Sequence, residues 1–154
     1  MSDHDSSELF DFEDGNGPIP AKRHINPDGT VGGWVAHTAT VANTVYVGYD
    51  AWVFGDARVF DKARVFDKAR IFGTAQVFDN AQVFGNAQVF DNVRIFGNAR
   101  VYDHVLVFDN AWVFGNARAF GNAQVFDVAR VFGNAWFGGD TKVTRKLWFP
   151  IRSE

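Results

Sequence analysis

The chain repeats one pattern of apolar and polar residues every six positions. From Ala51 to Asn134 each hexad reads mostly Ala, a long polar residue, Val or Ile, Phe, Gly or Asp, and then Asn, with no insertion. Because side chains alternate along a strand, positions 1 and 3 lie on one side and positions 2 and 4 on the other. Arg and Gln at position 2 must reach water, so Ala and Val are predicted to point inward.

Positions 5 and 6 predict a turn after each short strand, because Gly, Asp and Asn tolerate the backbone conformations of tight turns. One strand and one turn form one side of a coil, and three sides give a triangular coil of about 18 residues. Fainter copies extend the repeat in phase over residues 33–146, about 19 hexads. The sequence therefore predicts an all-β, single-domain parallel β-helix of about six coils. Stacked turn residues are expected at one corner, namely Asn80, Asn98, Asn116 and Asn134.

The two ends depart from the repeat. Residues 1–14 carry six acids and no Lys or Arg, so we expect an acidic disordered tail, in which Leu9-Phe10 and Phe12 are a candidate docking motif. Residues 15–32 hold three prolines and four glycines and are predicted to lead into the coil as an N-terminal cap. Residues 147–154 begin with a short apolar segment, predicted to be the C-terminal cap.

Composition narrows the function classes. The 154 residues include no Cys, so we expect no cysteine chemistry. The formal net charge of −3 does not indicate the clustered basic face that nucleic-acid binding needs, so we expect no nucleic-acid partner. No segment approaches the ~18 apolar residues of a membrane helix, and the acidic start lacks the features of a signal peptide. We therefore expect a soluble cytoplasmic protein with no membrane partner.

The repeat resembles a known family. The pattern Ala-x-[Val/Ile]-x-[Gly/Asp]-Asn is similar to the hexapeptide repeat of left-handed parallel β-helix proteins. Gly32-Gly33-Trp34-Val35, followed by runs such as Ala57-Arg58-Val59-Phe60, resembles a narrower group of uncharacterised bacterial and phage proteins. The resemblance covers about residues 28–146 and implies a left-handed coil. For a phage-encoded member, it implies a place in the virion.

Many hexapeptide-repeat proteins are acyltransferases, which gives the alternative interpretation. By that resemblance the chain acts as a trimer on acyl-CoA, with His104 or His37 as the catalytic base. The enzymes, however, interrupt their helix with a long loop and add a C-terminal helix, and neither feature is evident here. The enzymes also place a small or acidic residue after the inward aliphatic, where this chain has Phe.

The aromatic residue at position 4 is the most unusual feature of the repeat. Grouped by coil, these residues form three columns, and the first consists of Phe54, Phe72, Phe90, Phe108 and Phe126. Rings on successive coils can stack and stabilise the solenoid, each pair by ~0.5–1.5 kcal/mol. An exposed column would instead mark an interface. Both interpretations stay open, because a stacked column can also be one face of an oligomer.

Four outward tryptophans add a second candidate surface, Trp34, Trp52, Trp112 and Trp136, all at position 2. Trp34 and Trp52 are spaced by one coil and are expected to stack near the N-terminal end, either as a cap or as a binding patch. Trp112 and Trp136 are predicted to lie on different sides. No serine, phosphate-loop or metal-ligand motif accompanies these residues, and we expect neither a metal nor a cofactor.

The unbroken repeat favours a non-catalytic structural scaffold or protein-binding module. We expect its partner to be another protein or a second copy of itself, bound through a flat side or an end. Enzymes built on this architecture normally break the repeat where the chemistry takes place, and the fold alone does not establish function.

Overall fold

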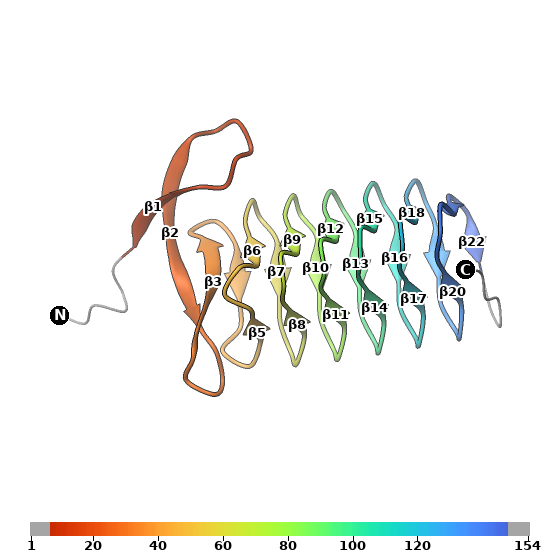
Figure 1. The fold of residues 1–154 in the computed structure, drawn as a ribbon, viewed down its shortest axis with the longest axis horizontal. Coiled ribbons are helices and arrows are strands. Elements are labelled where there is room, and N and C mark those ends of the chain that lie inside the picture. The colour runs from red at the N-terminus through yellow and green to blue at the C-terminus, as the bar shows by residue number, and fades with distance from the viewer. Residues whose placement is uncertain (1–6, 148–154) are drawn as a thin grey trace.

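Two-residue strands occupy positions 2 and 3 of nearly every hexad. In the computed structural model, which describes residues 7–147, they stack into three parallel sheets that form the sides of an elongated coil (Figure 1). Each strand pairs with the strand three hexads further along the chain, as Gln76 pairs with Arg94. The prediction of an all-β parallel solenoid with three hexads per turn is confirmed. The left hand implied by the resemblance stays a prediction.

We call the three sides the first, second and third face. The first face has the order β1 (Glu8–Asp11), β2 (Pro18–Ile25), β3 (Val31–Ala36), β6 (Trp52–Val53), β9 (Arg70–Ile71), β12 (Gln88–Val89), β15 (Leu106–Val107), β18 (Gln124–Val125), β21 (Lys142–Val143). The second has β4 (Thr40–Val41), β7 (Arg58–Val59), β10 (Gln76–Val77), β13 (Arg94–Ile95), β16 (Trp112–Val113), β19 (Arg130–Val131), β22 (Lys146–Leu147). The third has β5 (Tyr46–Val47), β8 (Arg64–Val65), β11 (Gln82–Val83), β14 (Arg100–Val101), β17 (Arg118–Ala119), β20 (Trp136–Phe137).

The core is a narrow column of small apolar side chains. Every position 1 and position 3 residue from Val45 to Ala135 is fully buried, with 0% of its surface exposed. The only buried polar residues of the described chain, His24 and Asn26, precede the first coil. The predicted inward and outward assignment is therefore correct.

The first coil begins where the backbone approaches its neighbours closely. A Cβ atom on Gly32 would lie 2.3 Å from the Val47 carbonyl oxygen, and one on Gly33 would lie 1.9 Å from that of Ala51. Only glycine fits at these two positions. The Gly-Gly pair that opens the repeat is therefore a packing requirement.

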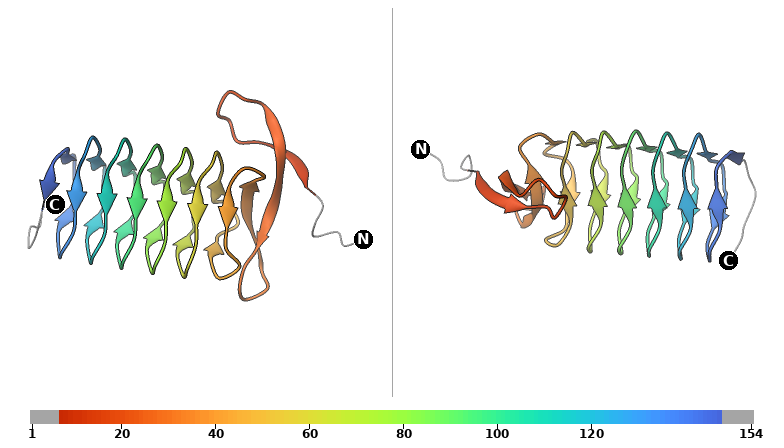
Figure 2. Two further views of the ribbon diagram at one scale, coloured as in Figure 1. Left: turned by 180° about the vertical axis from the view of Figure 1, so that it is seen from behind. Right: turned by 90° about the horizontal axis from the view of Figure 1, so that it is seen from above.

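Residues 7–14, the described part of the predicted disordered tail, are ordered against the chain. Glu8–Asp11 forms β1, which pairs antiparallel with β2, and β2 in turn pairs antiparallel with β3. The hairpin arches beyond the first coil and extends the first face (Figure 2). The physical reason is aromatic packing, because Phe12, which directly follows β1, is only 3% exposed.

The C-terminal end also differs slightly from the expected phase. Lys146 of β22 pairs with Arg130, which falls two positions short of the regular three-hexad spacing. Only Thr144 and Arg145 separate β21 from β22, and they lack the Gly/Asp-Asn turn pair of the regular corners. The coil thus continues to residue 147, and the predicted cap at residues 147–154 falls, apart from Leu147, outside the described residues.

Candidate functional site

Columns of stacked aromatic rings run along the outside of each face. The predicted column of the first face is present, with successive ring centroids 4.7, 4.8, 5.3 and 4.9 Å apart from Phe54 through Phe72, Phe90 and Phe108 to Phe126. Each ring beyond Phe54 stays partly exposed. The columns therefore join successive coils and still present ring surface to the outside.

The N-terminal hairpin covers the start of this first column. Phe12 stacks on Phe54 at 4.8 Å and reduces the exposure of Phe54 to 5%. Phe10 stacks on Trp34 at 4.6 Å and meets Trp52 edge-on at 5.1 Å. The two phenylalanine rings of the predicted docking motif thus pack against the chain's own first face, whereas its Leu9 is 71% exposed. Binding of a partner by this segment stays a prediction.

The outward tryptophans form part of columns that alternate with arginine. Trp34 and Trp52 pair in register as predicted, but the ring stacked on Trp34 is that of Phe10. Cation–π pairs between successive rungs join Arg70 to Trp52 at 3.7 Å, Arg94 and Arg130 to Trp112 at 5.3 and 4.2 Å, and Arg118 to Trp136 at 4.9 Å. Arg23 of β2 lies 4.8 Å from the Trp34 ring. Trp112 and Trp136 lie on the second and third faces, as predicted. Because these rings are covered by guanidinium groups, they do not form a continuous apolar patch.

The outward position-2 row distinguishes the first face from the other two. The second face carries Arg58, Arg94 and Arg130 in this row, and the third carries Arg64, Arg100 and Arg118. On the first face, three successive rungs between Arg70 and Lys142 carry no charge at position 2, namely Gln88, Leu106 and Gln124. Phe90, Phe108 and Phe126 flank this row, and Val128 at the adjoining corner is 61% exposed. We call these seven residues the neutral strip.

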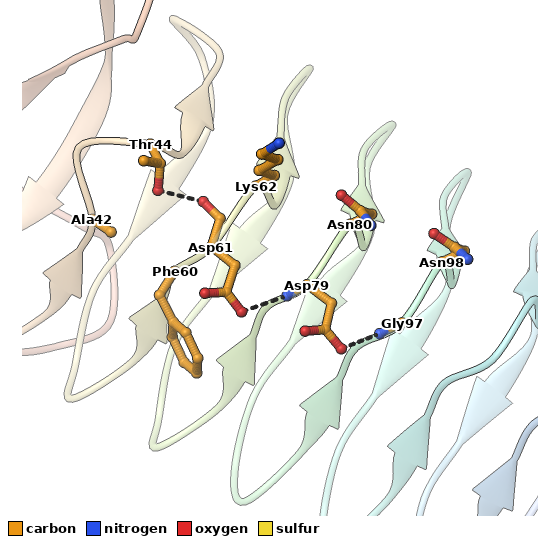
Figure 3. Close-up of a pocket in the computed structure, with 9 residues that line it drawn as sticks. All are labelled: Ala42, Thr44, Phe60, Asp61, Lys62, Asp79, Asn80, Gly97 and Asn98. Atoms are coloured by element: carbon orange, nitrogen blue, oxygen red, sulfur yellow. Dashed lines mark hydrogen bonds between the residues drawn. The ribbon is translucent and has the colours of Figure 1, made fainter.

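The corners use their polar side chains to hold one rung to the next. In a groove of about 600 Å³ between the second and third faces, Asp61 and Asp79 accept hydrogen bonds from the Asp79 and Gly97 amides at 3.2 and 3.0 Å (Figure 3). Thr44 donates to the Asp61 carbonyl, and Asn98 donates to Asn116 at 3.4 Å in the predicted ladder. These carboxylates are therefore structural. In the described part of the chain, no group of three or more His, Cys, Asp or Glu residues is placed to hold a metal.

The two histidines of the acyltransferase interpretation lie far apart in the coil. His104 is exposed at a corner after β14, where its amide donates to the Gly121 carbonyl. His37 follows β3, and both its amide and its ring Nδ1 lie 3.0 Å from the Pro20 carbonyl. His37 therefore fastens β2 to the first coil.

His24, which sequence analysis did not single out, is the most buried histidine of the described chain. Its Nε2 donates to the Val45 carbonyl at 2.7 Å. Burial lowers the pKa of His24, and the bond to Val45 opposes that effect only in part. The neutral imidazole is thus the form that fits this position.

A cavity of about 410 Å³ opens at the N-terminal end of the core, where His24 and His37 come together. Lys22 and Thr40 also line it, and its apolar wall is formed by Val35, Ala39 and Val41. Sequence analysis missed this cavity because β2 lies outside the repeat. Only the antiparallel pairing of β2 with β3 brings these side chains over the coil.

Comparison with known proteins supports the repeat architecture and does not indicate an activity. A family model described as the YdcK β-solenoid repeat matches residues 87–101, which include β12, β13 and β14. No curated protein and no solved structure matches the chain. Within residues 7–147 no helix is long and apolar enough to cross a membrane. The chain is similar to β-solenoid repeat proteins over the matched segment.

Proposed function

We propose that this chain is a non-catalytic β-solenoid scaffold that associates with a second copy of itself through the first face. The observation that carries the proposal is the neutral strip, in which three uncharged rungs are bordered by partly exposed phenylalanines. Charged residues are depleted and aromatic residues enriched at the centres of protein interfaces. The second and third faces carry three arginines each in the same row and are less suited to this role.

The interior and the corners of the coil support a structural role. The inward positions from Val45 to Ala135 are fully buried, and the aspartates of the corner groove bond to the backbone of the next rung. A rigid, flat surface with repeated aromatic residues loses little conformational entropy when it binds, because two χ angles define each ring. Such a surface favours a binding role.

The proposal is tested by the solution mass of the full chain, measured by light scattering over a range of concentrations. Leu106→Arg places a charge in the middle of the neutral strip, and the fold tolerates Arg at this position on other rungs. Gln82→Arg makes the equivalent change on the third face. We expect the wild type and Gln82→Arg to associate and Leu106→Arg to be monomeric with an unchanged melting temperature.

A monomeric wild type at all concentrations would contradict the proposed self-association. Equal association of both variants would place the interface elsewhere on the coil. A trimer that binds acyl-CoA and transfers its acyl group would contradict the non-catalytic role and support the acyltransferase alternative.

A further inference from the structure

The N-terminal end of a solenoid exposes the backbone groups that would pair with a preceding rung. We call a backbone group backward-facing when it points toward the preceding rung. The position-1 carbonyl is backward-facing, because the Ala57 carbonyl accepts a hydrogen bond from the amide of Thr40 in the preceding rung. Three faces therefore present three backward edges, on β3, β4 and β5. The chain treats these edges differently.

Two of the three edges are satisfied within the chain. The β3 edge on the first face pairs with β2. On the third face, the Val45 carbonyl accepts from His24 and the Val47 amide donates to Asn26 Oδ1 at 2.8 Å. These two side chains take the place of a missing rung.

The β4 edge on the second face has no such cover among residues 7–147. Its strand pairs only with β7, and the backward-facing Ala39 carbonyl and Val41 amide have no hydrogen-bond partner in that part of the chain. Ala39 and Val41 are also partly exposed, although the matching residues of the following rungs are fully buried. The cavity of about 410 Å³ lies at this edge.

The lining of the cavity indicates the chemistry of an occupant. Among residues 7–147, the titratable side chains that line it are those of Lys22, His24 and His37, and none of the described Asp or Glu residues lines it. Val35, Ala39 and Val41 form an apolar wall next to the free amide. We propose that this edge binds an extended peptide of a partner protein, which adds a strand to β4, places small apolar side chains against the wall and directs a carboxylate toward Lys22.

Strand addition of this kind draws its affinity from main-chain hydrogen bonds and its specificity from the pockets for alternate side chains. The open β4 edge supplies the main-chain hydrogen bonds, and the cationic and apolar parts of the cavity supply the side-chain pockets. The site lies at the end of the coil and away from the neutral strip. Peptide binding at this site therefore does not depend on the proposed self-association.

Amide hydrogen exchange of the isolated full chain tests whether the edge is open. The Val41 and Val47 amides occupy equivalent positions of neighbouring hexads, and Asn26 covers only the second. We expect the Val41 amide to exchange on the order of 100-fold faster than that of Val47. Equal protection of both amides would show that the chain already fills this edge and would overturn the proposal.

Peptide titration tests the occupant. The probe is a synthetic acetyl-Asp-Val-Thr-Val-Asp-amide, and its control carries N-methyl groups on both valines, which removes backbone donors. We expect the first peptide to protect the Val41 amide and the control to leave it unprotected. No protection at ~5 mM of the first peptide, or equal protection by both, would overturn strand addition.

Charge reversal tests the cationic part of the cavity. Lys22→Glu reverses a lining charge, and Lys68→Glu makes the same change at a distant exposed corner. At low salt we expect Lys22→Glu to weaken peptide binding at least about fivefold and Lys68→Glu to change it less than about twofold. Equal effects of the two substitutions would overturn the assignment of the carboxylate to Lys22.

Discussion

Neighbouring residues of one strand have opposite environments in this solenoid. Ile95 is fully buried among apolar side chains, whereas Arg94 beside it is exposed, with its guanidinium 5.3 Å from the Trp112 ring. Ile95→Asp places a charge with no partner in the core, so we expect it to cost several kcal/mol and to unfold the chain. Arg94→Glu loses only a surface contact of at most about 1 kcal/mol. Urea unfolding of the two variants measures the difference.

Equal damage by both substitutions would contradict the inward and outward assignment. That assignment was available from the sequence, because arginine and glutamine recur at position 2 and alanine and valine at positions 1 and 3. The role of the corner aspartates was not available. Asp61 has a positive φ of 59°, as a turn former should, but its carboxylate also accepts the Asp79 amide of the next coil. Spacing along the chain does not show where a carboxylate points.

Protonation of His24 gives the fold a dependence on pH. Because burial lowers the pKa of His24 in the folded state, the unfolded chain binds a proton more readily. The contribution of neutral His24 to the free energy of unfolding is therefore fully present above pH 6.5, the pKa of histidine in the unfolded chain. It is lost as the pH falls from 6.5 toward the lower pKa of His24 in the folded state. We expect the urea midpoint to decrease between pH 7.5 and pH 5.

His24→Gln is the matched control, because its side-chain amide keeps a donor for the Val45 carbonyl and does not titrate. Its urea midpoint is expected to stay nearly constant over the same pH range. The pKa of Asp28 is lowered by hydrogen bonds from the Thr30 side chain and backbone, so Asp28 titrates below 3.8, outside this window. An unchanged pH dependence in His24→Gln would assign the effect to other groups.

The N-terminal hairpin is the element that the sequence concealed. The six acidic residues of positions 1–14 favoured disorder there, and the repeat offered no template for an antiparallel pair. What decides the structure is the match between Phe10 and Phe12 and the aromatic residues already exposed at the start of the first face. That match depends on tertiary contacts between residues far apart in the sequence, such as Phe12 and Phe54, which local patterns do not report.

Removing the Phe12 ring is expected to detach this element from the coil. Phe12→Ala deletes a ring that is only 3% exposed and stacks on Phe54, and such truncations cost about 3–5 kcal/mol. Because the hairpin contacts only the first coils, we expect local opening: faster amide exchange in β1 and β2, faster proteolysis there, and little change in the coil. Leu9→Ala, at a residue 71% exposed on the same strand, should leave both measurements unchanged. Equal exchange rates in the two variants would contradict the docking role.

At the scale of the whole molecule, each coil contacts only its neighbours, so the fold should tolerate the loss of one complete coil. Deletion of residues 75–92 removes β10, β11 and β12 and brings β7 next to β13. Val59 then pairs with Ile95, Phe60 with Phe96, and Asp61 with the Gly97 amide, each on its original face. We expect circular dichroism to show a folded solenoid with a lower melting temperature, as nearest-neighbour stability requires.

Deletion of residues 75–77 removes fewer residues and should be far more harmful. A shift by half a hexad would bring Phe and Asn to the inward positions 1 and 3 of the later coils and would place Arg or Gln at the corner position that Gly or Asp occupies, so the core and the turns would both be disrupted. If the variant that lacks residues 75–77 were more stable than the variant that lacks residues 75–92, the six-residue repeat would not determine the fold.

Deletion of one hexad, residues 75–80, tests the proposed function. It keeps the hexad phase but rotates the later coils by one face. The neutral strip would then no longer continue the face that carries the hairpin, whereas its own residues would stay together. We therefore expect this variant to fold and to self-associate with altered geometry, detectable as a different mass or shape in solution. A single-hexad deletion that unfolds the chain would show that the Asp and Gly corners are specific to their faces, and that the three faces are less equivalent than their shared hexad implies.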